Sequence, residues 1–200
     1  LDTFQTMVNP GKPIPIRVQQ STGIHDEDVR DALHFNAIRL EIEDFIGDAT
    51  IVGQNVGFDL RFLSEEGVEP RGAVLDTLDM AAILEPQLRD RSLGALAEHF
   101  QVDMPVAHRA LADADATRSV FLALVDRARE LPEGLLADLV ALDAPEILGA
   151  SDEGADPSDE APSWALAALL RDIAAERGIN LAPRRVAAAP PSPQGRARPA

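Results

Sequence analysis

Two short apolar segments, each followed at once by a helix-favouring segment, constrain the fold of this chain most strongly. ATIVGQN (49–55) precedes GFDLRFLSEEG (57–67), and AVLDTL (73–78) precedes a second such segment. The apolar segments have the length and composition of buried strands, and the segments after them are helical in character. Strands that alternate with helices favour parallel pairing. We therefore expect an α/β fold with a partly parallel sheet.

Further elements are expected on both sides of this unit. Loose alternation over residues 2–8 predicts a strand, which the prolines of NPGKPIP end. Residues 35–46 place their apolar side chains on one helical stripe, and residues 92–100 begin with a serine that can cap a helix. The last helix runs to about residue 130, and Asp115 on it is expected to face solvent. Asp76 is expected to cap the helix that follows the second apolar strand, and the alternative is that it supports metal ligands without binding a metal itself.

Charge and cysteine content exclude several classes of protein. The formal net charge is −16, so overall charge cannot hold a nucleic acid, and any such role needs a local site where divalent metals screen phosphates. The chain has no cysteine, which excludes disulfides and cysteine-ligated metal centres and is consistent with a cytoplasmic location. No apolar run approaches the roughly 20 residues that span a bilayer, so we expect no membrane association.

The composition changes near residue 150, where SDEGADPSDEAPS is acidic, contains proline and lacks apolar residues. It reads as a linker, and the helix-favouring segment after it reads as amphipathic. The expected units are an α/β domain over 1–130, a helical connector over 131–150, an acidic linker over 151–163, an amphipathic helix over 164–178 and a disordered tail rich in proline, alanine and arginine over 179–200.

Two places in the chain combine metal-capable groups with the ends of structural elements. Asp59 lies just after the first apolar strand, and His108 precedes Asp113 by five residues at the start of the last helix. Such carboxylates can converge above a parallel sheet, and their oxygens suit Mg²⁺ or Mn²⁺. A histidine can take a proton from a water that two metals about 4 Å apart orient for phosphodiester hydrolysis. Taken alone, Asp59 is more simply a helix-start carboxylate, and His108 a loop histidine.

Four motifs occur in a fixed order over roughly residues 3–130: TGI (22–24), VGQNVGFD (52–59), LDTL (75–78) and HRALADADAT (108–117). In this order and at this spacing they resemble the DEDDh group of DnaQ-like 3'–5' exonucleases. The resemblance implies an RNase H-like α/β fold, a mixed sheet with flanking helices. It also implies an enzyme that hydrolyses phosphodiester bonds at DNA 3' ends by a two-metal mechanism.

The resemblance assigns roles to individual residues. Asp59 and Asp113 would bind the metal, as two Mg²⁺ or Mn²⁺ ions in an intact family member, and His108 would deprotonate the attacking water. Phe58 would wedge against a base, and Gln54 departs from the family, where histidine is frequent. The residues expected to contact the 3' end of single-stranded DNA are Thr22, Gly23, Ile24, Gln54, Asn55 and Phe58.

One family motif, Asp-x-Glu on the central first strand, is absent from any expected strand of this chain. Its spacing would put both carboxylates on one face of that strand. The strand over residues 2–8 matches the third strand of the family. We therefore expect an N-terminally truncated fragment that lacks the first two strands of the sheet. Such a fragment should be inactive alone and of marginal stability.

Other functions and contexts stay open at this point. The chain could be a non-catalytic module that binds nucleic acid or a partner, or a 3'–5' exoribonuclease. Its C-terminal part resembles the connector of DinG-like proteins, in which a helicase domain follows the exonuclease. The other context is a DNA polymerase III epsilon-like subunit, whose tail would bind the polymerase. The chain has no phosphate-loop motif, so no ATP binding is expected.

Overall fold

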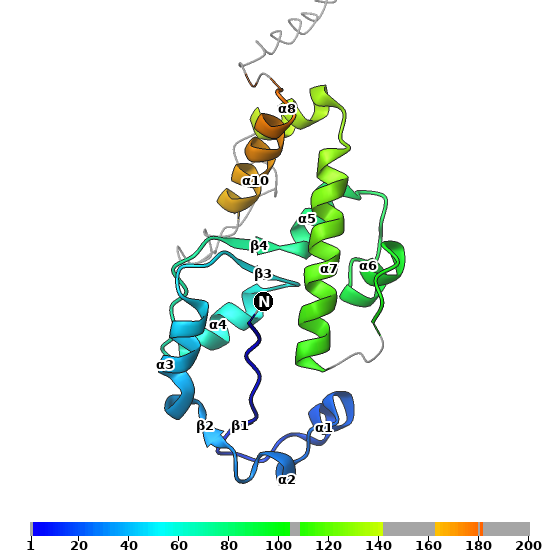
Figure 1. The fold of residues 1–200 in the computed structure, drawn as a ribbon. Coiled ribbons are helices and arrows are strands. Elements are labelled where there is room, and N and C mark those ends of the chain that lie inside the picture. The colour runs from blue at the N-terminus through cyan, green and yellow to red at the C-terminus, as the bar shows by residue number, and fades with distance from the viewer. Residues whose placement is uncertain (1, 105–108, 142–162, 180, 182–200) are drawn as a thin grey trace, which may run out of the picture.

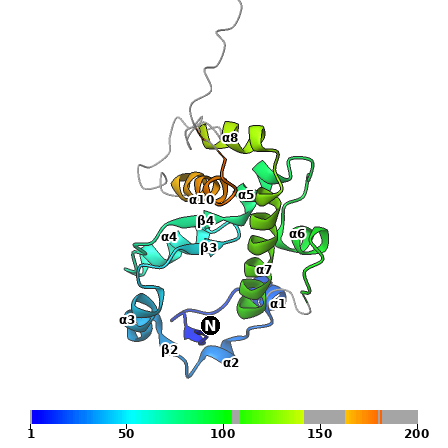
Figure 2. The same ribbon diagram turned by 45° about the horizontal axis from the view of Figure 1, so that its top comes forward.

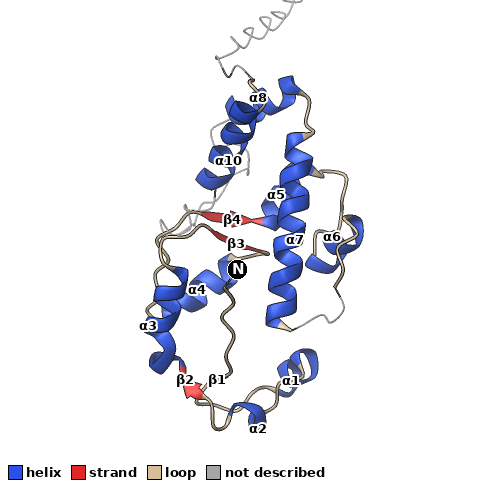
Figure 3. Ribbon diagram, in the orientation of Figure 1, coloured by secondary structure: helices blue, strands red, loops and turns tan. Residues whose placement is uncertain are grey.

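A computed structural model of the chain describes residues 2–104, 109–141, 163–179 and 181. Figures 1 and 3 show a helix-rich fold with two short parallel ladders. No helix in these ranges is long and apolar enough to cross a lipid bilayer. In chain order the elements are β1 (Val8–Asn9), α1 (Ile16–Thr22), α2 (Asp26–Val29), β2 (Leu33–His34), α3 (Phe35–Ile46), β3 (Ile51–Gly53), α4 (Gly57–Glu65), β4 (Val74–Asp76), α5 (Thr77–Leu84), α6 (Leu93–His99), α7 (Ala110–Arg129), α8 (Glu133–Ala141) and α10 (Ser163–Glu176).

The β3–β4 ladder confirms the alternation of strands and helices in the middle of the chain. β3 pairs in parallel with β4, and Gly53 lies opposite Asp76 at their carboxyl ends. α4 connects the two strands, as the parallel order requires. The helices expected after each strand and over residues 35–46 are present, and so is the helix after Ser92. The sequence pattern was sufficient here because each element carries its own start and stop signals.

The hydrophobic core lies between this ladder and the helices that follow it. α7 contacts β3, α5 and α6, and α10 contacts β4, α7 and α8. Figure 2 shows α10 beside α8, next to β4. Burial of one large aliphatic side chain contributes about 1.5–3 kcal/mol. The largest side chains with almost no exposure are Met80, Leu96, Leu124, Leu136, Leu170 and Ile173.

No residue in the segment from residue 2 to β2 belongs to this core. β1, α1, α2 and β2 lie at the lower end of Figure 1, and residues 2–7 run from there up to the middle of that view. The prediction of a strand over residues 2–8 is wrong except at its end, since only Val8 and Asn9 pair, in parallel with β2. Residues 2–7 have no ladder partner among the described residues, and an alternating pattern forms a strand only beside another strand. Within this segment Val29 is the one buried side chain. No strand in the described ranges joins the two ladders into the single mixed sheet that we expected.

Helix α3 packs less tightly than its apolar stripe predicts. Ile38 is buried, but Phe45 keeps half of its surface exposed. Phe35 meets Phe62 of α4 edge to face, with ring centroids 5.7 Å apart, and Phe45 meets Phe4 at 5.6 Å. These aromatic contacts connect α3 to α4 and to the N-terminal segment, at the margin of the core.

Helix α10 packs on the same core as the α/β unit, although it follows the acidic segment in sequence. Leu170 of α10 is fully buried, and the Arg177 guanidinium just after the helix donates a hydrogen bond of 2.6 Å to the Leu131 carbonyl. Arg129 of α7 also reaches Glu176, at 3.5 Å. The apolar face of α10 is therefore occupied by the protein itself. The expected boundaries between separate units stay predictions.

Candidate active site

The chain folds back sharply where β3 ends. Gly53 is the last residue of the strand, and a Cβ atom there would lie 2.5 Å from Cγ2 of Val56. Only glycine allows this approach. Asn55 takes a left-handed backbone conformation with φ of +55°, which asparagine tolerates better than most residues. α4 then begins at Gly57, so the VGQNVGFD motif forms a strand, a tight turn and a helix start.

Asp76, the last residue of β4, holds this turn from the neighbouring strand. Its Oδ1 accepts hydrogen bonds from the backbone N–H groups of Asn55 and Leu78, each at 2.9 Å. Its Oδ2 accepts one from Val56 N–H at 2.8 Å. The bond to Leu78 confirms that Asp76 caps α5. The two bonds to the turn were not expected, because they cross between motifs about 20 residues apart.

Gln54 is held inside the fold by both atoms of its amide. Its Nε2 donates to the Arg91 carbonyl at 2.8 Å, and its Oε1 lies 2.5 Å from the Thr77 hydroxyl. That hydroxyl is also 3.0 Å from the Gly53 carbonyl, and Thr77 is fully buried. Gln54 therefore stabilises the end of β3. Its expected contact with a nucleotide stays a prediction, and it would compete with these two bonds.

Asp59 and Phe58 project from the first turn of α4. Phe58 has 71% of its surface exposed, so its ring is accessible from solvent. Partial burial raises the pKa of Asp59 above its ordinary value, a hydrogen bond to its own backbone N–H lowers it, and the negative charge of Asp76 raises it further. The first turn of α4 thus carries both an exposed apolar ring and a carboxylate.

Asp113 lies in the first turn of α7, the helix that packs against β3. Its Oδ1 is buried and has no hydrogen-bond partner among the residues that the structure describes. A carboxylate oxygen without a partner is costly to bury, so this position favours a bound cation or a donor. Asp115, two residues on, is exposed as predicted. His108, the expected general base, lies outside the described residues.

The TGI motif forms the end of α1. The Thr22 hydroxyl donates to the Val18 carbonyl at 2.8 Å and accepts from Ile24 N–H at 3.2 Å. Gly23 has φ of +68°, the left-handed conformation that ends many helices. These contacts account for the motif as a helix end. Its expected place at the entrance for a 3' end stays a prediction.

The described residues contain no group of three or more histidine, aspartate or glutamate side chains that could hold a metal ion. The structure brings the VGQNVGFD and LDTL motifs together at the carboxyl ends of two parallel strands. Asp59 lies in the first turn of α4 and Asp113 in the first turn of α7. Both residues keep their expected role as predictions.

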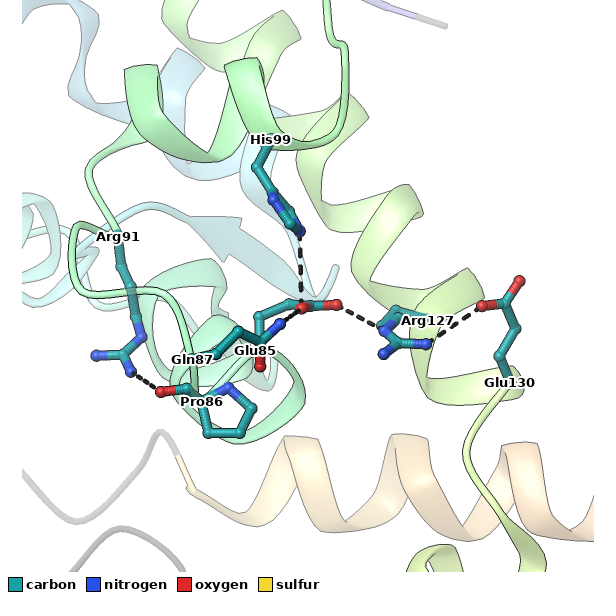
Figure 4. Close-up of polar contacts among 7 residues, drawn as sticks. All are labelled: Glu85, Pro86, Gln87, Arg91, His99, Arg127 and Glu130. Carbon is teal, nitrogen blue, oxygen red and sulfur yellow. Dashed lines mark hydrogen bonds and ion pairs between the residues drawn. The ribbon is translucent and has the colours of Figure 1, made fainter.

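A buried polar cluster that the sequence did not reveal connects the end of α5 with α6 and α7 (Figure 4). Glu85 follows α5 and has 4% of its side chain exposed. Its Oε1 accepts from Arg127 Nε of α7 at 2.6 Å, its Oε2 lies 3.6 Å from His99 Nε2 of α6, and Gln87 also donates to it. The hydrogen bond and charge of Glu85 raise the pKa of Arg127. Glu85 thus connects three helices, and nothing in the spacing of these residues predicted that.

The sequence matches one known protein family and is similar to several known proteins. The sequence model of the Exonuclease family matches residues 1–121. Similar proteins include a PolC-type DNA polymerase III of Caldanaerobacter subterraneus subsp. tengcongensis, 33% identical over 135 residues, which are 66% of this chain and 10% of that protein. The 3'-5' exonuclease DinG of Bacillus subtilis is 33% identical over 143 residues, 69% of this chain and 15% of that protein.

A PolC-type DNA polymerase III of Bacillus cereus is 30% identical over 122 residues, which are 58% of this chain and 8% of that protein. The matches therefore span 15% or less of the length of these three relatives. The family match, in contrast, covers more than half of this chain and contains the β3 and β4 motifs together with Asp113. The chain belongs to the exonuclease family.

Proposed function

We propose that this chain is a 3'–5' exonuclease domain that hydrolyses phosphodiester bonds at the 3' ends of single-stranded DNA, in replication or repair. Its family implies a hydrolase that acts on nucleic acids, with an RNase H-like α/β fold. The observation that carries the proposal is the turn after β3, which presents Phe58 and Asp59 at the carboxyl ends of two parallel strands. Ligands of open α/β sheets bind at this edge.

Divalent metal ions fit the carboxylates that are present. The Oδ1 of Asp113 is buried and has no hydrogen-bond partner among the described residues, so it would gain a cation as its partner. Oxygen ligands are those that Mg²⁺ and Mn²⁺ prefer. We propose that Asp113 and Asp59 hold the metal. When bound, it supplies a Lewis acid for the phosphate and lowers the pKa of water. The exonuclease family generally uses divalent metals.

Side chains of this chain would also transfer the proton and bind the DNA strand. His108 would accept the proton of the attacking water, as a histidine can near neutral pH. The exposed ring of Phe58 would stack on a base near the 3' end, a contact worth about 1–3 kcal/mol in single-strand binders. Asn55, Thr22, Gly23 and Ile24 would line the path of the strand. The residues proposed for the reaction therefore lie mainly around the turn between β3 and α4 and near the start of α7.

Two observations favour a second function, which is binding without cleavage. The described residues bring no three metal-capable side chains together, and the sequence has no Asp-x-Glu on a strand. The usual two-metal route needs more carboxylates than Asp59 and Asp113. We therefore propose that the 200 residues by themselves hydrolyse DNA poorly or not at all. Hydrolysis by that route would need further carboxylates beside Asp59 and Asp113.

The relatives suggest where the domain works. Because they are a PolC-type DNA polymerase III and the exonuclease DinG, we propose that the chain acts beside a polymerase subunit or a covalently following helicase domain. The apolar face of α10 is not available for such a partner in this structure, because Leu170 and its neighbours are buried against α7, α8 and β4.

The proposed function is tested with 5'-labelled single-stranded DNA and RNA of matched sequence, in Mg²⁺ or Mn²⁺. The protein is this chain together with any natural sequence that adjoins it. We expect stepwise loss of nucleotides from the DNA 3' end. His108→Ala should lower turnover by about 100-fold or more with less effect on binding. Asp59→Ala and Asp113→Ala should raise the metal concentration needed.

The matched control is Asp115→Ala, an exposed carboxylate on the same helix as Asp113, which should leave activity unchanged. Equal activity in all four variants would remove the assignment. Binding of DNA with no cleavage in any form would favour the non-catalytic module, and faster loss of RNA would change the substrate.

A further inference from the structure

We propose that Asp76 is a positioning residue that fixes the turn between β3 and α4 and so determines where Phe58 and Asp59 lie. The inference rests on the proposed function, because it gives these two residues their role. Asp76 itself would contact neither metal nor nucleotide. Its carboxylate is occupied by the backbone of its own protein, with bonds to three N–H groups.

The turn has a backbone conformation that needs support from its surroundings. Asn55 lies in the left-handed region, and Val56 lies so close to Gly53 that a Cβ atom on residue 53 would clash with its side chain. A non-glycine residue keeps such a conformation only when its surroundings impose it. The bonds from Asn55 and Val56 to the Asp76 carboxylate, at 2.9 and 2.8 Å, supply that constraint from the adjacent strand. Charge-assisted bonds of this kind are stronger than neutral ones.

A second contact beside Asp76 acts in the same direction. Thr77 is buried, and its hydroxyl lies within hydrogen-bond distance of both Gly53 and Gln54. Asp76 therefore holds the turn, and Thr77 holds the end of β3 and the Gln54 side chain. A helix cap alone would need only the bond from Leu78. The extra bonds are what the inference explains.

The capping role and the positioning role can be separated by substitution. Serine caps helices as well as aspartate does, but its side chain is shorter and carries one oxygen. Asp76→Ser should therefore keep the bond to Leu78 and lose those to Asn55 and Val56. Asp79→Ser is the matched control, because Asp79 lies in the first turn of the same helix and has no hydrogen bond to the turn among the described contacts.

The first measurement is amide hydrogen exchange by NMR on the whole chain. In Asp76→Ser, exchange at Asn55 and Val56 should rise about tenfold, as expected for the loss of one or two hydrogen bonds, while Leu78 changes little. Asp79→Ser should leave all three amides unchanged. Unchanged exchange at Asn55 and Val56 in Asp76→Ser would overturn the inference, and so would an equal rise in Asp79→Ser.

The second measurement connects the turn to the reaction. Mn²⁺ added to the wild-type chain should broaden the Asp59 amide signal, and Asp76→Ser should need several-fold more Mn²⁺ for equal broadening. If exchange rises but the Mn²⁺ response is unchanged, Asp76 has only a structural role and the inference is overturned. If Mn²⁺ does not broaden Asp59 even in the wild-type chain, the metal role of Asp59 in the proposed function fails. The exchange result still decides whether Asp76 fixes the turn.

Discussion

The chain contains two parallel ladders of similar size, and only one of them lies on the hydrophobic core. The β1–β2 ladder pairs two residues and the β3–β4 ladder pairs three. Leu75 of β4 is 6% exposed, whereas Leu33 of β2 is 59% exposed. Both segments have apolar residues and helices nearby. Strand pairing alone therefore does not determine how much a segment contributes to the fold.

The difference lies in what covers each ladder. Helices α7 and α10 contact β3 and β4, and every side chain of the core cluster comes from residue 52 onward. The β1–β2 ladder has no such cover among the described residues, and Val29 is the one buried side chain between residues 2 and 34. A two-stranded ladder is marginal in water unless a helix or further strands pack on it. The candidate active site is built on the covered ladder.

The largest expected effect comes from truncating a leucine in each region. Leu170→Ala removes a fully buried side chain of α10 and should lower the free energy of unfolding by about 2–5 kcal/mol. Leu33→Ala, on the exposed strand β2, should change it by less than about 0.5 kcal/mol. Denaturant unfolding of both variants measures this. A similar loss in the two would mean that the ladders do not differ as described.

Substitution of one glycine in each region should give a smaller difference in stability. A Cβ atom on Gly72 would lie 1.8 Å from the Ala49 carbonyl oxygen, so Gly72→Ala must move the loops that lead into β3 and β4. We expect a loss of about 1–3 kcal/mol. Gly11 has φ of +67° and no atom closer than 3.8 Å, so Gly11→Ala meets only backbone strain, of about 1 kcal/mol. Thermal unfolding of the pair should rank Gly72→Ala as the more damaging.

The smallest effect concerns charge near the covered ladder. Burial, and then the negative charge of Asp76, raise the pKa of Asp79 above 3.8. The folded state therefore binds the proton more tightly than the unfolded state, and this stability is lost as pH rises through the raised pKa. Asp79→Asn should raise the melting temperature at neutral pH. The gain in the free energy of unfolding should be less than about 1 kcal/mol, because the carboxyl group is half exposed.

The same substitution should have no such benefit well below pH 3.8, where the carboxyl group is protonated in both states. Asp31→Asn, an exposed position near β2, is the control and should leave the melting temperature unchanged at either pH. Equal stabilisation by the two variants would show general charge reduction of an acidic chain and not a local effect at Asp79.

The sequence was informative where a structure is local. The helices after β3 and β4, the cap at Asp76, the cap at Ser92 and the exposure of Asp115 all depend on neighbours within a few residues, and all are confirmed. Helix α1 was missed, because the prolines before it were read only as the end of a strand. The strand over residues 2–8 failed because it requires a partner that alternation alone does not reveal.

Contacts between distant segments could not be predicted in the same way. The Glu85 cluster joins residues 85, 99 and 127, and the packing of α10 on β4 joins segments separated by the acidic stretch. At the candidate site, the motifs indicated Asp59, Phe58 and Asp113. They did not indicate that Gln54 is held by Arg91 and Thr77, or that Asp76 holds the turn. These depend on the register of β3 against β4.

The most direct test of this account is residue-by-residue hydrogen exchange on the unmodified chain. We predict the slowest exchange in α7 and α10, near Leu124 and Leu170, clear protection of the Asn55 and Val56 amides, and little protection over residues 2–34. Strong protection over residues 2–34, or free exchange at Asn55 and Val56, would contradict the claim that the candidate site is built on one covered ladder.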